Sequence, residues 1–200
     1  VVFLTIAFSP WVRAADERPA VVVAVNELPR GLEPAETHGN VDIRVTYSIF
    51  DTLLRRDFSS DSGAALKPLL AESWQRLSPT EVEVKLRRGV VFHSGDPFDP
   101  DDVVFTFSPE RIASPAAAIP DGRQYFGHLK EVRKIDSHTV RFVTEKPDPV
   151  LEQRLASYSS WIVSHRQWQR YRSGDPKWVQ HPLREGGWNP GGTGPVKFTG

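Results

Sequence analysis

The clearest hydrophobic pattern in the chain is an alternation of charged and apolar residues over 81–86 (EVEVKL). It predicts a half-buried strand whose three apolar side chains face inward. A β-branched run over 20–25 predicts a buried strand. Runs over 129–135 and 139–144 flank Asp136-Ser137-His138, an order typical of two strands joined by a turn. Shorter strands are expected over 90–92, 161–163 and 196–199.

The start of a helix is marked most clearly at Pro100, because proline is favoured at the first helical position and Asp99 before it is a suitable N-cap. Asp101 and Asp102 complement the positive end of the helix dipole. Pro109 is expected to distort or end this helix. Further helices are predicted over 66–74, 149–156 and 165–172.

Helical spacing of Val41, Val45, Ile49 and Leu53 predicts one more helix, with Asn40 as its N-cap. Alternating short strands and helices indicate an α/β or α+β fold. The chain is 39% hydrophobic and 10% aromatic, which argues for a packed core and against disorder. Its 200 residues allow one domain of ordinary size, or one domain and part of another.

The charge balance and the lack of cysteine exclude several classes of partner and site for this chain. Lys and Arg together number 25, as do Asp and Glu, so no electrostatic attraction to nucleic acid or to an anionic membrane surface is expected. The sequence contains no cysteine, which excludes disulfides, thiolate metal sites, a cysteine nucleophile and a lipidated N-terminal Cys.

The first fifteen residues resemble the end of a signal peptide. An apolar run over 1–8 is too short to span a bilayer, and small residues follow it at Ala14 and Ala15, where cleavage is expected. The alternative is a buried first strand of a cytosolic domain. We expect export, with 1–15 as a signal-peptide remnant and 16–200 as the mature part, soluble in the periplasm and not lipid-anchored.

Five segments in order resemble the extracellular solute-binding proteins of family 5, which bind peptides, nickel chelates and related solutes. Leu32-Glu33-Pro34 resembles the Leu-Asp-Pro of that family, with Glu33 in place of Asp. The others are Ile49-Phe50-Asp51-Thr52-Leu53, Leu70-Ala71-Glu72-Ser73-Trp74, the long segment 86–98 followed by Asp101-Asp102-Val103-Val104-Phe105, and Gly192-Thr193-Gly194-Pro195-Val196-Lys197-Phe198, where Val196 replaces an aromatic residue.

This resemblance implies a lobe of the type II periplasmic binding proteins, a mixed sheet flanked by helices. Residues 16–200 would be the N-terminal lobe, with the second lobe missing from this chain. Family members close two hinged lobes over a ligand and deliver it to the membrane permease of an ABC importer. The expected partners are therefore a peptide or other small solute and a permease, with the receptor itself monomeric.

Other patterns suggest chemistry but have simpler structural explanations. The sequence from His93 to Asp96 is typical of a turn. Glu81 and Glu83 share one strand face, which we expect to be solvated rather than a glycosidase pair. Residues 191–195 lack the Lys-Ser/Thr of a phosphate loop and are expected to pack against backbone near the cleft. None of the six histidines has metal-ligand spacing, so no metal, cofactor or catalytic residue is expected, although a nickel chelate as the ligand stays open.

Candidate ligand contacts are placed on loops at strand ends, where open α/β sheets bind their ligands. A carboxylate in the loop after the first strand could bind a ligand ammonium group, and a segment that mixes hydroxyls with aromatics is typical of ligand clefts. The candidates are Glu27, Leu28, Tyr158, Ser159, Ser160 and Trp188. Core packing and ordinary surface loops remain the alternative explanation for each of them.

Two functional alternatives stay open from the sequence. One is a periplasmic hydrolase that uses carboxylates such as Asp96 or Glu83. The other is a truncated fragment that binds nothing. The export signal and the five family-like segments imply a binding protein and not an enzyme, and the Gly-x-Ser-x-Gly elbow of serine hydrolases does not occur in the sequence.

Overall fold

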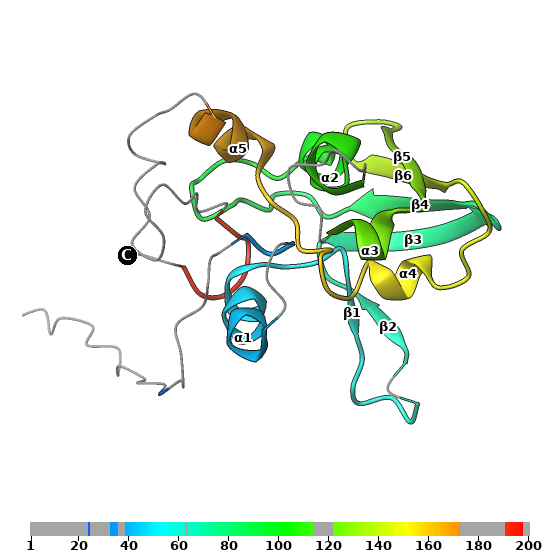
Figure 1. The fold of residues 1–200 in the computed structure, drawn as a ribbon, viewed down its shortest axis with the longest axis horizontal. Coiled ribbons are helices and arrows are strands. Elements are labelled where there is room, and N and C mark those ends of the chain that lie inside the picture. The colour runs from blue at the N-terminus through cyan, green and yellow to red at the C-terminus, as the bar shows by residue number, and fades with distance from the viewer. Residues whose placement is uncertain are drawn as a thin grey trace, which may run out of the picture.

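A four-stranded antiparallel sheet organises the middle of the chain (Figure 1). The computed structural model describes residues 24, 33–35, 39–62, 64–113, 122–172 and 191–197. The sheet contains β3 (Ala71–Ser78), β4 (Glu81–Leu86), β5 (Leu129–Lys134) and β6 (Thr139–Thr144), in the order β3-β4-β6-β5. The predicted strands over 81–86, 129–135 and 139–144 are thereby confirmed, whereas the strand predicted over 20–25 lies outside the described residues.

The inner face of the sheet carries the alternating apolar residues of β4. Val82, Val84 and Leu86 are all buried, as the alternation predicts. Val82 lies opposite Phe142 and Val84 opposite Val140 in the antiparallel register with β6. Cross-strand pairs of this kind are the unit of sheet stabilisation, so β4 and β6 together form the base of the core.

Helix α2 (Pro100–Thr106) covers this face and packs on β5 and β6. It begins as predicted, with the Asp99 side chain accepting from the Asp101 amide at 2.9 Å and Asp102 accepting from the Asp99 amide at 2.9 Å. This reciprocal capping box satisfies two amides that a helix N-terminus otherwise leaves unbonded. The predicted break at Pro109 is a π-helical turn, η1 (Pro109–Ala113).

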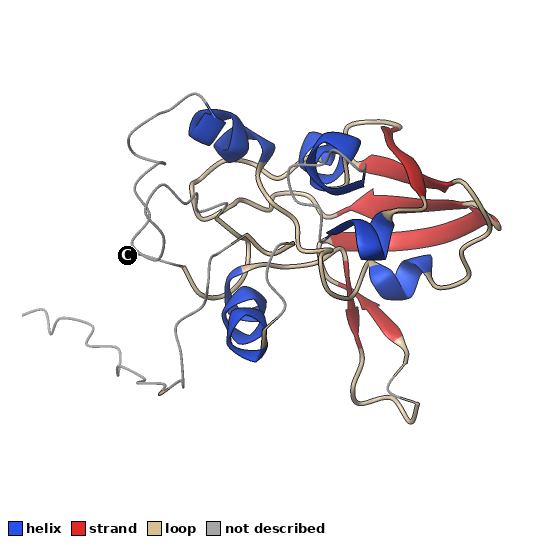
Figure 2. Ribbon diagram, viewed as in Figure 1, coloured by secondary structure: helices blue, strands red, loops and turns tan. Residues whose placement is uncertain are grey.

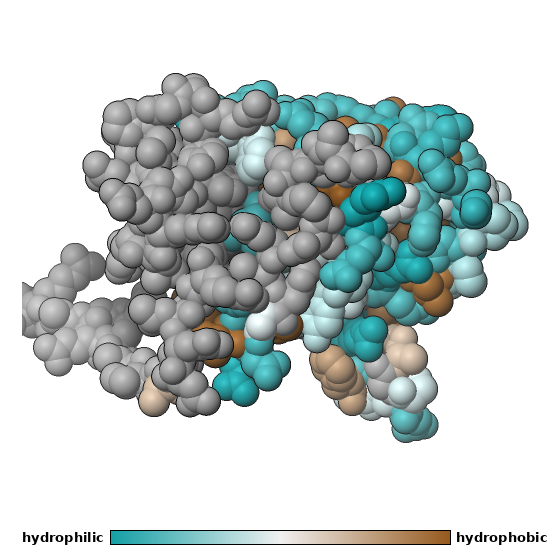
Figure 3. Space-filling view, in the orientation of Figure 1, coloured by the Kyte–Doolittle hydropathy of each residue, from teal (hydrophilic) through white to brown (hydrophobic). Residues whose placement is uncertain are grey.

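Besides the sheet and α2, the described residues form further helices and a two-stranded hairpin (Figure 2). They are helices α1 (Asn40–Ile49), α3 (Arg123–Phe126), α4 (Leu151–Arg154) and α5 (His165–Arg172), and a hairpin of β1 (Leu54–Arg56) and β2 (Leu66–Pro68). The hairpin projects from the body of the molecule (Figure 1). Hydrophilic residues make up most of the described surface seen in Figure 3. No helix in the described ranges has the length and apolar character needed to cross a membrane.

The helix predicted over 66–74 is wrong, because this segment forms β2 and the beginning of β3. Long-range pairing decides the outcome: Trp74 lies opposite Val84, and the Ala71 amide donates to the Leu53 carbonyl at 2.9 Å. Pairing with a neighbouring strand overrides a local preference that is only weak.

Smaller departures concern the ends of elements. The N-cap of α1 is Gly39 and not Asn40, and the helix ends at Ile49 because Phe50 has extended backbone. The strands expected over 90–92 and 161–163 are reduced to isolated bridges at Val91 and Trp161. The described part of the strand expected over 196–199 has no regular structure.

Three phenylalanines fill the space between the sheet, α2 and α3. The Phe107 ring lies 4.8 Å from that of Phe126 and 5.2 Å from that of Phe142, in edge-to-face geometry. All three are buried. Edge-to-face aromatic pairs stabilise a core beyond the burial of their area.

Replacing Phe142 by Ala is therefore expected to lower the free energy of unfolding by about 3–5 kcal/mol, since it opens a cavity under β4 and α2. Denaturant titration followed by circular dichroism measures the change. Phe58→Ala is the matched control, because this ring is 82% exposed and its loss should change the free energy by less than about 0.5 kcal/mol. Equal effects of the two substitutions would contradict this account of the core.

Candidate functional site

The segment that contains Tyr158, Ser159 and Ser160 links α4 to α5. Tyr158 is 37% exposed, whereas the side chains of Ser159 and Ser160 are buried. Ser159 has a positive φ of 60°, the left-handed region that residues with a Cβ seldom adopt. Of these three predicted contacts, only Tyr158 presents its side chain at the surface. Glu27, Leu28 and Trp188 lie outside the described residues.

Tyr158 belongs to a row of aromatic rings from three parts of the chain. Its ring centroid lies 6.2 Å from that of Trp161 and 6.4 Å from that of Tyr125 in α3. Tyr47 of α1 packs edge-to-face on Trp161 at 5.2 Å. We call these four residues the aromatic row; Trp161 is its buried centre and Tyr47, 53% exposed, its outer end.

The hydroxyls of the aromatic row make it amphipathic. Burial raises the pKa of Tyr47, and the neighbouring Tyr158 raises it further. Rings with an apolar face and a hydroxyl at the tip are suited to ligands that have both apolar and polar parts. Sequence reasoning missed Tyr47 and Tyr125, because nothing in a linear pattern places α1 and α3 beside residue 158.

The glycine-rich segment 191–197 packs its backbone directly on the end of α1. A Cβ at Gly192 would lie 1.8 Å from the Ile49 carbonyl oxygen. The Gly194 amide donates to this same oxygen at 2.9 Å, and the His93 amide donates to the Gly192 carbonyl at 2.8 Å. The interpretation of these glycines as backbone packing rather than as a phosphate loop is confirmed.

Side chains around this contact are engaged with one another. Thr193 donates to a carboxylate oxygen of Asp51 at 3.0 Å, and a ring nitrogen of His93 lies 2.7 Å from the Gly194 carbonyl oxygen. Burial raises the pKa of Asp51, while the Thr193 hydroxyl and His93 act in the opposite direction. His93 and Asp51 therefore hold the glycine segment in place.

The two carboxylates considered for hydrolase chemistry are each held in an ion pair. Asp96 accepts two hydrogen bonds from the Arg170 guanidinium, at 2.7 and 2.9 Å, and these bonds lower its pKa. Glu83 accepts from Arg141 across the sheet at 2.8 Å. A general acid at neutral pH needs a raised pKa, so Asp96 has the opposite environment. The turn predicted from His93 to Asp96 is present, with the Gly95 amide donating to the Phe92 carbonyl at 2.8 Å.

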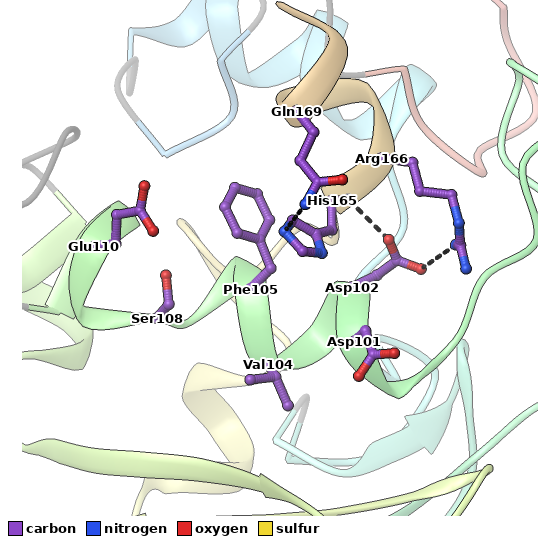
Figure 4. Close-up of a pocket in the computed structure, with 9 residues that line it drawn as sticks. All are labelled: Asp101, Asp102, Val104, Phe105, Ser108, Glu110, His165, Arg166 and Gln169. Atoms are coloured by element: carbon purple, nitrogen blue, oxygen red, sulfur yellow. Dashed lines mark hydrogen bonds and ion pairs between the residues drawn. The ribbon is translucent and has the colours of Figure 1, made fainter. Parts of the chain in front are cut away.

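A pocket of about 400 Å³ opens between α2 and α5 (Figure 4). Phe105 stacks on the His165 ring with centroids 4.8 Å apart, and Asp102 accepts from the His165 amide at 2.8 Å. Burial raises the pKa of Asp102 to about 7, although hydrogen bonds from the amides of Asp99 and His165 act in the opposite direction. The lining is completed by Asp101, Val104, Ser108, Glu110, Arg166 and Gln169.

Each polar side chain that lines this pocket already has an interaction within the chain. Arg166 donates to Asp99 at 2.7 Å, Asp101 accepts from Lys134 at 2.9 Å, and Glu110 also has a partner. A ligand would have to displace these bonds, so the pocket is best explained as a crevice between two packed helices. Over the described parts of the chain, no group of three or more His, Asp or Glu side chains is arranged to hold a metal ion.

Gly192→Ala is expected to lower the free energy of unfolding by about 3 kcal/mol or more, because the new methyl group would overlap the Ile49 carbonyl. Gly89→Ala is the control: it has no atom near its added Cβ and would suffer only from its positive φ, at about 1–2 kcal/mol. Thermal and urea unfolding of both variants measure the difference, and a milder effect at Gly192 than at Gly89 would refute the close contact.

Asp96→Asn is expected to cost about 1 kcal/mol of stability at pH 7 through loss of the Arg170 pair. Because the folded-state pKa of Asp96 is lowered, its contribution is present above the unfolded-state pKa and is lost as pH falls through the folded-state pKa. The gap between wild type and variant should therefore shrink below about pH 4. Urea titrations from pH 3 to 8 test this, and a gap that is independent of pH would contradict it.

Comparison of the sequence with known proteins identifies a family that the chain resembles. The model for "Bacterial extracellular solute-binding proteins, family 5 Middle" matches residues 65–200. Di/tripeptide-binding protein 2 of Pseudomonas aeruginosa is 29% identical over 98% of the chain, and the probable ABC transporter periplasmic-binding protein SapA of Escherichia coli is 36% identical over 50% of it. The chain spans 38% and 21% of the lengths of these two relatives.

Solved structures support the fold. The dipeptide-binding protein of Pseudoalteromonas sp. SM9913, in complex with Met-Leu, has a TM-score of 0.69 at 23% identity, covering 84% of this chain and 34% of that one. NikZ of Campylobacter jejuni, in complex with Ni(L-His), has a TM-score of 0.61 at 24% identity, covering 84% and 31%. The predicted α/β lobe of a type II periplasmic binding protein is confirmed, although every strand pair among the described residues is antiparallel. The chain belongs to the bacterial extracellular solute-binding proteins of family 5.

Proposed function

We propose that the protein carrying this chain is a periplasmic receptor that captures peptides or similar small solutes for an ABC importer. The observation that carries this proposal is the family match over residues 65–200. Relatives named for di- and tripeptides, at 29–32% identity, support the choice of peptides. Binding would close the lobes about a hinge, and the closed form would dock on the permease.

The ligand contact proposed for this lobe is the exposed end of the aromatic row together with the backbone around Ser159. Tyr158 supplies a ring and a hydroxyl at the surface. The left-handed conformation of Ser159 supports the same location, because strained backbone clusters at ligand-binding sites. Glu27, Leu28 and Trp188 stay sequence predictions for the same cleft, with the Glu27 carboxylate suited to an ammonium group.

Binding without turnover is the proposed mode of action. The family and the relatives described above are named as binding proteins. The carboxylates of Asp96 and Glu83 are each held in an ion pair. The proposed receptor is exported and monomeric. A hydrolase is not favoured by any observation made on the described residues.

Calorimetric titration of the complete protein with the dipeptide Met-Leu tests the proposal. Binding should raise the melting temperature and give a more compact particle in X-ray scattering, since ligand stabilises the closed native form. Tyr158→Ala should raise Kd about tenfold, a loss of about 1.4 kcal/mol, with Tyr158→Phe in between. Leu77→Ala on the exposed side of β3 is the control and should bind like wild type.

The possible outcomes test the ligand contact at Tyr158 separately from the receptor function. Binding that is unchanged in Tyr158→Ala would remove the aromatic row as the contact while leaving the receptor function intact. No response to di- and tripeptides, nickel chelates or sugars would overturn the receptor function itself.

A further inference from the structure

A buried ion pair joins two parts of the chain that are 78 residues apart. Arg111, in the turn η1, is completely buried and its guanidinium pairs with the carboxylate of Glu33. A second guanidinium nitrogen of Arg111 donates to the Thr106 carbonyl at 2.8 Å. Glu33 also accepts from the Ala35 amide at 2.9 Å. The pair thus ties the segment 33–35 to the C-terminal end of α2.

The polar chain continues from α2 into the segment that carries Tyr158. The hydroxyl of Thr106 accepts a hydrogen bond from the Val163 amide at 3.2 Å and lies 3.5 Å from the Val163 carbonyl oxygen. Both residues are buried. Val163 is three residues beyond Ser160 in the irregular stretch between α4 and α5 (Figure 1).

The desolvation cost of burying the Glu33–Arg111 ion pair indicates a role beyond stability. Burial lowers the pKa of Arg111 and Glu33 offsets this effect, which is the balance expected of a paired charge in a dry site. Apolar residues of similar volume often give equal or greater stability than a buried pair. What an ion pair adds is direction, because the guanidinium bonds fix where the carboxylate and the Thr106 carbonyl lie.

The stretch from 157 to 164 is also bonded to the chain just after α1. The Ile162 amide donates to the Asp51 carbonyl at 2.9 Å, and Trp161 bridges Thr52. Loss of the Thr106 bond would leave Ile162 attached to the end of α1 while the adjoining Val163 amide is released. The stretch that follows Ser159, whose φ is positive, would then lose one of its anchors to the rest of the fold.

We infer that Glu33, Arg111 and Thr106 are positioning residues that hold the Tyr158–Ser160 segment in its ligand-binding geometry. They act through Val163 and do not touch the ligand. The effect on affinity rests on the proposed receptor function, whereas the effect on the segment itself does not.

A matched pair of variants in the complete protein tests the inference. Thr106→Val keeps the shape of the side chain but removes the acceptor for the Val163 amide, and Thr106→Ser keeps the hydroxyl. In Thr106→Val, hydrogen exchange of the amides in 157–164 should accelerate about tenfold and Kd for Met-Leu should rise about tenfold, at a temperature where the protein is fully folded. Thr106→Ser should show the wild-type exchange rate and the wild-type Kd.

A second comparison separates positioning from stability. Glu33→Met and Arg111→Met should each destabilise the protein strongly, because each leaves an unpaired buried charge, while the double variant should recover most of the melting temperature. The inference expects the double variant to keep fast exchange in 157–164 and weak Met-Leu binding despite this recovery.

Wild-type exchange over 157–164 in both Thr106→Val and the double variant would overturn the inference. Should the double variant fail to fold, the comparison of Thr106→Val with Thr106→Ser tests the inference by itself. If wild-type protein itself gives no response to Met-Leu, the receptor proposal loses support, and the exchange measurement still decides whether these residues position the segment.

Discussion

Main-chain carbonyls at the end of α1 hold together segments from across the whole described chain. Ser48 and Ile49 accept from Val196 and Gly194, Asp51 accepts from Ile162, and Leu53 accepts from Ala71. Because an N–H donor lies within a narrow range of distance from a carbonyl oxygen, these contacts restrict where the glycine segment, the β3 edge and the stretch before α5 lie. Their close approach requires glycine at 192, where no side-chain atom fits.

The hydrogen bonds at the end of α1 also explain the position of the aromatic row. Tyr47 near the end of α1 and Trp161 in the stretch before α5 meet because Thr52 and Asp51 bind that stretch. Within the aromatic row, Trp161 stays buried, whereas Tyr47 and Tyr158 reach the surface.

Several elements could be predicted because their physical signal is local. The alternation in 81–86 gave β4 with its inward valines, and Asp99-Pro100 gave the start of α2 with a reciprocal cap. The segment 66–74 could not be predicted, since its apolar residues suit a helix as well as a strand and the choice was made by pairing with residues 53 and 84. The same limit applies to Tyr47 and Tyr125, which reach Tyr158 only through packing.

By itself, the sequence determined the α/β class, the main strands, the capped helix and the family, because periodicity, capping chemistry and ordered motifs are properties of neighbouring residues. Only the tertiary structure decided that Tyr158 is exposed while Ser159 and Ser160 are buried, and that Arg111 finds Glu33 across 78 positions. The physical reason is that local patterns report which residues prefer burial, whereas the partner that a buried group meets depends on how distant segments converge.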